Sequence, residues 1–151
     1  DEVHHRLEAD SWNSLQVLEH ILGSERGTLA YLMKKTQADW QDIPLVGEEH
    51  AEGSRKLNAA LISDRKWKAP QVLKVPEGER SLSEMSQYWA DLREKMYIFV
   101  EQLDQNYHGR QIFKHPISGR LDLYQTLEFL ANHVAHHMHQ LERIRADFNA
   151  A

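Results

Sequence analysis

Residues 122–148, DLYQTLEFLANHVAHHMHQLERIRADF, decide the fold because they carry an unbroken helical pattern. On a helical wheel of about 100° per residue, the following apolar side chains fall within roughly 60° of Leu130: Leu127, Val134, Leu141, Ile144 and Phe148. Asp122 and Gln125 form a capping-box pair at the start of the pattern. The stretch is therefore predicted to be one amphipathic helix that reaches about Phe148.

Two of the four histidines in this stretch share its buried face. His137 lies about 20° and His133 about 60° from the reference residue, whereas His136 is near 120° and His139 is almost opposite. Histidines four residues apart lie one above the other on a helix, and this spacing recurs in helical zinc sites. One buried histidine is more often bonded to a carbonyl or carboxylate, but the pair favours a metal ion. We expect His136 on a flank and His139 in solvent, both without a functional role.

A third ligand has to come from another segment. Only His20 lies in a strongly periodic stretch, whereas the other histidines lie near termini or turns: His4, His5, His50, His108 and His115. On its own wheel His20 lies about 160° from Leu18, so geometry alone leaves its orientation open. Small residues beside it, Gly23, Ser24 and Gly27, would permit a close helix approach. A helix buried on two sides would carry both arcs, which supports His20 as the third ligand.

Periodic apolar residues and caps predict three more helices: Ser11 to about Lys35, Glu48 to about Asp64, and Ser81 to about Asn106. The first has Asp10 or Ser11 as its N-cap, and Ser81 and Glu84 form a capping box for the third. Each of these helices would contribute one apolar face to a common core. The sequence therefore predicts an all-α fold, a four-helix bundle.

Turn residues separate the predicted helices. Loops are expected at 37–47, at 67–80, and at the tight connection from His115-Pro116 to Gly119. No segment alternates with period two for long enough to need a strand. We expect residues 1–151 to form a single domain.

Composition excludes several classes of function. No apolar run approaches the ~18 residues of a membrane span, so no membrane partner is expected. The net charge is −5, with lysines and arginines scattered among acidic residues, which argues against nucleic-acid binding. The absence of cysteine excludes disulfides, thiolate zinc sites and cysteine nucleophiles. Without a recognisable signal peptide, a cytoplasmic location is expected.

Three stretches resemble the DinB/YfiT-like superfamily: Trp12-Asn13-Ser14-Leu15 leading to Leu18-Glu19-His20-Ile21, His115-Pro116 with Gly119-Arg120-Leu121, and His133-Val134-Ala135-His136-His137 followed by Gln140. Proteins of that superfamily are four-helix bundles in which one histidine of an early helix and an HxxxH pair of the last helix bind zinc, nickel or a similar ion. The resemblance implies that His20, His133 and His137 are the ligands. The ordered motif is fairly specific, whereas HxxxH alone is weak.

The resemblance has one departure, at the start of the chain. Family members usually have a helix before the Trp-Ser segment, and here only Asp1 to Asp10 precede it. Either that first helix is missing from the chain, or the helix of Glu48 to Asp64 or a second subunit completes the bundle. We expect a homodimer, because a missing helix would leave apolar surface to cover.

Three neutral imidazoles leave a coordination position open, which is typical of a catalytic metal. Such an ion can lower the pKa of bound water towards ~7 or activate a thiolate. The resemblance implies both kinds of relative, S-transferases or isomerases that use low-molecular-weight thiols and suspected hydrolases. We therefore expect a divalent-metal-dependent enzyme, with zinc or nickel, that acts on a small-molecule substrate. The alternatives are a non-catalytic metal- or ligand-binding bundle, closed by His136 or a glutamate, and a bundle without metal.

Supporting roles are predicted for five other residues. Gln140 would donate to a ligand or substrate, and Glu19 or Glu25 would orient a histidine, although each is more often a surface residue. Trp12 and Trp89 are expected to fill the core rather than stack on a substrate. No residue is assigned as a general base.

Overall fold

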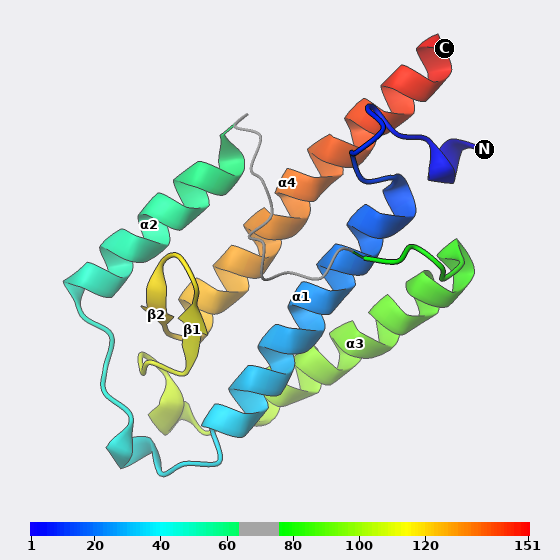
Figure 1. Ribbon diagram of the computed structural model, residues 1–151. Helices are drawn as coiled ribbons and strands as arrows, with labels where there is room; N and C mark the ends of the chain where they lie inside the picture. Colours follow the sequence, from blue (N-terminus) through cyan, green and yellow to red (C-terminus); the bar gives the residue numbers. More distant parts are fainter. Residues whose placement is uncertain (64–75) are drawn as a thin grey trace.

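Four helices and one short hairpin make up the computed structural model, which describes residues 1–63 and 76–151. The helices are α1 (Ser14–Lys35), α2 (Glu48–Ile62), α3 (Leu82–Gln102) and α4 (Leu123–Ala150). In Figure 1, α2, α4, α1 and α3 follow one another across the molecule: α4 packs against α2 and α1, and α1 packs against α3. The predicted all-α fold is confirmed, and α2 provides one of the four helices.

The last two helices begin at the predicted capping boxes. At the start of α3, the backbone N–H of Ser81 donates to the Glu84 carboxylate at 2.9 Å, and the Ser81 hydroxyl accepts from the backbone of Glu84. At the start of α4, Asp122 and Gln125 make the same reciprocal pair at 2.8 and 3.0 Å. These bonds satisfy N–H groups that lack a partner inside the helix. Both predictions are confirmed.

The predicted start of the first helix was wrong. The N-cap of α1 is Asn13, whose side-chain oxygen accepts from the backbone of Gln16 at 2.9 Å, while the Gln16 side chain accepts from Asn13 N at 3.2 Å. The hydroxyl of Ser11 is used differently, in a local turn with the backbone of Glu8. An Asn-x-x-Gln pair satisfies two donors at once, and therefore the helix begins there and not at Asp10 or Ser11.

The prediction that the chain has no strand was also wrong. Strands β1 (Phe113–His115) and β2 (Gly119–Leu121) form an antiparallel hairpin. The expected tight connection is its turn, in which Nδ1 of His115 accepts from the backbone N–H groups of Ile117 and Ser118 at 3.1 and 3.2 Å. Three residues per strand are too few to show an alternating pattern.

The hairpin packs closely against α2. A Cβ atom at Gly53 would lie 2.6 Å from the carbonyl oxygen of Ser118, so only glycine permits this approach. The hairpin also contacts α1 and α4, and in Figure 1 it lies between α1 and α2. It therefore packs against three of the four helices.

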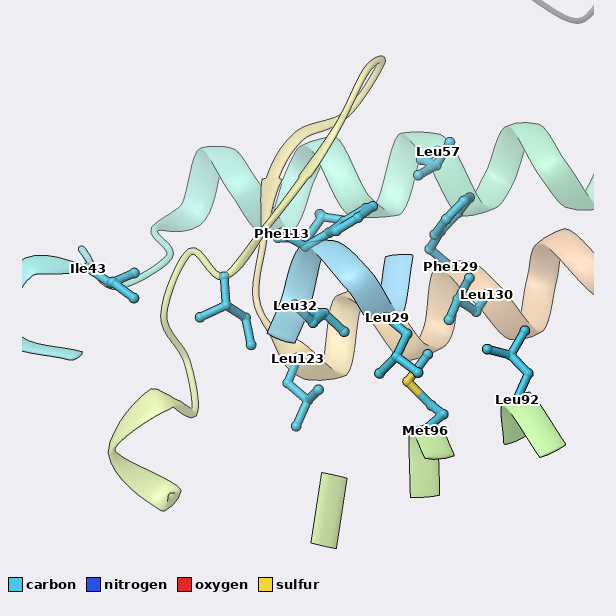
Figure 2. Close-up of a cluster of buried hydrophobic side chains, with 12 residues drawn as sticks. Leu29, Leu32, Ile43, Leu57, Leu92, Met96, Phe113, Leu123, Phe129 and Leu130 are labelled. Atoms are coloured by element: carbon cyan, nitrogen blue, oxygen red, sulfur yellow. The ribbon is translucent and has the colours of Figure 1, made fainter. Parts of the chain in front are cut away.

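The main hydrophobic core lies between the hairpin and all four helices. It consists of Leu29, Leu32, Ile43, Leu57, Leu92, Met96, Ile112, Phe113, Leu121, Leu123, Phe129 and Leu130. Figure 2 shows Leu57 of α2 beside Phe129 of α4, and the Phe113 and Phe129 rings stack with centroids 6.4 Å apart. The strand residue Phe113 thus fixes the hairpin to α4 by burying apolar surface.

Helix α1 buries two arcs of its surface. Leu15 and Leu22 pack with Met85 of α3, while Val17 and Ile21 pack with Ile144 of α4. This confirms the expectation of a helix buried on two sides. The expectation of close approach at Gly23 and Gly27 was wrong, because a Cβ atom at either would meet no atom of the described residues within 4 Å.

The predicted loop at 67–80 and the predicted end of the third helix compare with the structure as follows. The predicted loop at 67–80 falls on residues 67–75, which lie outside them, and residues 76–80 form no helix or strand. The third helix ends at Gln102, before the predicted Asn106, and Gln105–Tyr107 form a separate 3-10 turn. Across residues 1–63 and 76–151, no helix combines the length and apolar character that a membrane span needs.

Candidate metal site

The three predicted ligands meet between α1 and α4. Nε2 of His133 lies 3.1 Å from Nε2 of His20 and 3.1 Å from Nε2 of His137. One ligand atom of each histidine lies within 4.8 Å of the others. Two imidazoles bound at about 2.0–2.1 Å to a tetrahedral ion have nitrogens about 3.3 Å apart, which is close to these separations. The cluster fits a divalent metal ion.

Packing of α1 against α4 directs His20 towards the pair. Val17 and Ile21, which flank His20 in sequence, are fully buried with Ile144 of α4. The imidazole ring of His20 therefore faces the other two ligands, with centroids 5.0 and 4.8 Å from theirs. The helical wheel had left this orientation open because both arcs of α1 are buried.

Gln140 supports one ligand directly. Its Oε1 accepts a hydrogen bond from Nδ1 of His137 at 2.9 Å, which leaves the lone pair on Nε2 directed into the cluster. The predicted contact to a ligand is confirmed, but Gln140 accepts rather than donates. In contrast, Nδ1 of His133 is buried and has no hydrogen-bond partner within residues 1–63 and 76–151. Of the two candidate ligands of α4, only His137 is therefore held by a hydrogen bond at Nδ1 among the described residues.

Burial keeps the ligands neutral. His133 and His137 are each 8% exposed, and burial lowers the pKa of His133 to about 2 and that of His137 to about 4. Repulsion from neighbouring imidazoles lowers both pKa values further. Burial also lowers the pKa of His20. Each imidazole is thus unprotonated at pH 7, as metal binding requires.

The two other histidines of α4 lie outside the cluster. Nδ1 of His136 donates to the backbone carbonyl of Leu61 at 2.9 Å, so this flank residue holds the end of α2. His139 is exposed beside Glu142, as predicted. Among the described residues, the converging ligand atoms come from the three histidines, and neither His136 nor a carboxylate joins them.

The predicted roles of two glutamates were wrong. Glu19 accepts from the backbone N–H of Gly78 at 2.7 Å. Glu25, which is 1% exposed, accepts from Trp89 Nε1 at 3.0 Å and from Arg93 Nε at 2.7 Å. Both carboxylates hold other segments of the chain rather than orient a histidine. The wheel gives their angle on α1 but not which element lies opposite.

Both tryptophans fill the core, as predicted. Trp12 and Trp89 are partly buried against the cluster formed by Val17, Ile21 and Ile144. The Trp12 ring also lies 5.2 Å from the ring of His20, between centroids. Trp12 therefore shields one side of the metal site.

One more histidine, His115 of the hairpin, lies near the site. His115 was assigned only to a turn, but its ring packs against Phe129 with centroids 4.6 Å apart. Phe129 precedes His133 by one turn of α4, and those two ring centroids are 5.5 Å apart. The available signal was the His-Pro pair, which a turn alone does not require.

The comparisons with known proteins agree with this arrangement. A family model described as the DinB superfamily matches residues 1–141. The chain is similar to the uncharacterized protein YuaE of Bacillus subtilis (strain 168), with 22% identity over 151 residues, 100% of this chain and 88% of the relative. No solved structure shows a significant match. The family match spans nearly the whole chain, including His20, His133 and His137, and the chain therefore belongs to the DinB superfamily.

Proposed function

We propose that this protein is a metal-dependent enzyme that binds one divalent ion on His20, His133 and His137. The observation that carries the proposal is the convergence of three Nε2 atoms from two helices. Their burial, their lowered pKa values and the bond from His137 to Gln140 all favour lone pairs that point at one place. Zinc and nickel both suit imidazole ligands.

The chemistry that we propose for this site is S-transfer with a low-molecular-weight thiol. Three protein ligands leave a position for water or substrate, and a bound ion would there activate a thiol or a water molecule. The chain contains no cysteine, so the thiol has to be a small molecule. The resemblance to the superfamily's thiol-dependent transferases supports this reaction, and metal-assisted hydrolysis is the alternative at the same position.

The residues around the cluster would control access to it. The buried group of Val17, Ile21 and Ile144 packs between α1 and α4 beside the cluster, and the ring of Trp12 lies against His20. Gln140 fixes the orientation of His137. A small substrate would therefore approach along the side of α4 that the hairpin flanks.

A second candidate function is a non-catalytic metal site that joins the helices. It is favoured by the origin of the ligands, because an ion bound to His20 and the pair on α4 would link α1 to α4. Such a structural site would have a closed coordination sphere, whereas the enzyme needs an exchangeable position.

Metal content tests the site itself. Wild type, His137→Ala and His139→Ala should be purified without a histidine tag, reconstituted with zinc or nickel, and analysed by mass spectrometry. His139 is the matched control because it lies on the same helix and is exposed. We expect about one ion per chain in wild type and His139→Ala and a large loss in His137→Ala. Equal metal in all three proteins, or none in any, would overturn the proposal.

Cobalt substitution then separates the enzyme from the structural site. Cobalt(II) bound to three histidines should develop a thiolate-to-cobalt charge-transfer band when 2-mercaptoethanol enters the open position. Titration of wild-type protein should therefore give a saturable band. A spectrum that does not respond to thiol or azide would support the closed, non-catalytic site.

A further inference from the structure

The His115-Pro116 motif has no role in the three-histidine cluster. Within β1, Phe113 is buried, Lys114 is exposed and His115 is half-buried, so Phe113 and His115 point to the same side of the hairpin. That side faces α4, because the His115 ring packs edge-on against Phe129. His115 therefore lies on the inner face of the hairpin.

One aromatic ring separates His115 from a ligand of the proposed metal ion. The ring of Phe129 lies 4.6 Å from that of His115 and 5.5 Å from that of His133, between centroids. The charge of a protonated His115 also contributes to the lowered pKa of His133. His115 is thus close enough to the cluster to contact a small molecule that occupies it.

Hydrogen bonds fix the tautomer of His115. Its Nδ1 accepts from two backbone N–H groups, those of Ile117 at 3.1 Å and Ser118 at 3.2 Å. Burial lowers the pKa of His115 to about 4, so the ring is neutral at pH 7 and carries its proton on Nε2. His115 therefore presents an N–H donor on the edge of the ring that faces away from the turn.

This donor is free to bind a ligand. Nε2 of His115 makes no hydrogen bond with the described part of the chain. The buried side-chain polar atoms that lack a partner in residues 1–63 and 76–151 are Ser118 Oγ and His133 Nδ1, and Nε2 of His115 is not one of them. The N–H group is consequently accessible from outside the protein.

The hairpin lies at the end of the histidine cluster that Phe129 marks. At the other end of the cluster along α4, Ile144 packs with Val17, Ile21 and Trp89 of α3. The hairpin instead contacts α1, α2 and α4, and in Figure 1 it lies between α1 and α2. A molecule held at the histidines would therefore extend past Phe129 towards His115.

We propose that Nε2 of His115 donates a hydrogen bond to a carboxylate or carbonyl oxygen of the small molecule that occupies the three-histidine site. This inference rests on the proposed function, since the ion would hold the other end of that molecule. Because the rings of His115 and His133 both contact Phe129 and make no ring contact with each other, we expect the oxygen to be separated from the metal-bound sulfur by several atoms. The favoured class of ligand is a mercapto acid or a longer thiol with an oxygen acceptor.

The competing interpretation is that His115 serves only the turn. Asparagine tests it well, because an Asn side chain before proline accepts the same backbone N–H bonds in an Asx turn but has no Nε2 donor. His115→Asn should therefore keep the hairpin and lose the donor. Lys114→Gln is the matched control, since it changes the exposed neighbour on the same strand.

The experiment uses cobalt-loaded wild type, His115→Asn and Lys114→Gln. Dissociation constants are measured from the thiolate charge-transfer band for mercaptoacetate, 3-mercaptopropionate and 4-mercaptobutyrate, and for ethanethiol, which has no acceptor. We expect His115→Asn to weaken the best mercapto acid by about tenfold, as for one hydrogen bond to a charged group, and ethanethiol by less than about twofold. Lys114→Gln should behave as wild type, and thermal unfolding should show all three folded.

The outcomes are distinguishable. An equal loss for the acids and ethanethiol in His115→Asn, or no loss for any probe, overturns the role of His115 and leaves the proposed function intact. Absence of the thiol band in wild type overturns the proposed function and this inference with it. If His115→Asn does not fold, His115→Ser replaces it, because a serine hydroxyl can accept in the same turn.

Discussion

Acid should destabilise the metal-free protein, because its histidine cluster is buried in the neutral form. The pKa values of His133 and His137 are about 2 and about 4 in the folded protein, against 6.5 for an ordinary histidine. For each residue, at pH values between its folded pKa and 6.5, the unfolded chain binds more protons than the folded one. The contribution of each residue to stability is therefore complete above pH 6.5 and is lost progressively as the pH falls below that value.

The magnitude follows from the two shifts. Each imidazole that stays neutral lowers the free energy of unfolding by about 1.4 kcal/mol for every pH unit below 6.5. His133 and His137 together therefore lower it by about 4 kcal/mol at pH 5. Domains of this kind have free energies of unfolding of about 5–15 kcal/mol. The metal-free protein should thus lose a large part of its stability between pH 7 and pH 5.

Urea unfolding in the presence of a chelator measures this effect, with circular dichroism as the signal. His137→Gln replaces one titrating histidine by a neutral amide and should lose about a third of the pH dependence, because His133 and the half-buried His115 contribute similar amounts. The same change at exposed His139 should leave the dependence as in wild type. A wild-type free energy of unfolding that does not change between pH 7 and pH 5 would refute the reasoning, as would identical pH profiles for the two variants.

Three other substitutions test particular contacts. Gly53→Ala should destabilise the protein by about 1–3 kcal/mol in urea unfolding, because its Cβ would lie 2.6 Å from a hairpin carbonyl, whereas Gly23→Ala meets nothing and should stabilise it by up to about 1 kcal/mol. Gln140→Ala removes the acceptor for a ligand imidazole and should weaken zinc binding by about 10–100-fold in a chelator competition, with no loss if that bond is unimportant. Arg93→Met leaves the buried carboxylate of Glu25 without its cation and should cost about 2–3 kcal/mol in urea unfolding at pH 7, and an unchanged stability would mean that this ion pair does not contribute.

Local signals in the sequence predicted most of the helices. The capping boxes at Ser81 and Asp122 and the apolar period of α4 depend on residues three to seven apart, which a sequence shows directly. The start of α1 was mispredicted because Asp10, Ser11 and Asn13 are all good N-caps, and only the partner at Gln16 separates them.

The hairpin could not be predicted from its own residues. Its strands have three residues each, and its position depends on contacts with distant parts of the chain, at Gly53 of α2 and Phe129 of α4. Glycine inside a helix usually weakens that helix. In the structure Gly53 is the point where the hairpin approaches, so its meaning depends on a tertiary contact.

In the candidate site, too, some residues could be predicted from local spacing and others depend on how the helices pack. The pair His133 and His137 follows from spacing on one helix, and Gln140 follows from its place one turn further along α4. The orientation of His20 depends on how α1 packs, and spacing left it open until the resemblance to the superfamily supplied it. Glu19 and Glu25 show the limit of the wheel, because each carboxylate bonds to an element that the wheel does not contain.

The burial that makes the metal-free protein sensitive to acid should also make metal binding by the folded protein insensitive to it. Three exposed histidines with an ordinary pKa would lose about thirtyfold in zinc affinity between pH 7 and pH 6, because protons would compete at each ligand. In this cluster the pKa values of His133 and His137 lie far below that range and that of His20 is lowered, so few protons compete. We expect the dissociation constant for zinc, measured by chelator competition on folded protein, to change by about threefold or less. A change near thirtyfold would mean that the ligands are solvated and that the site forms only when the ion binds.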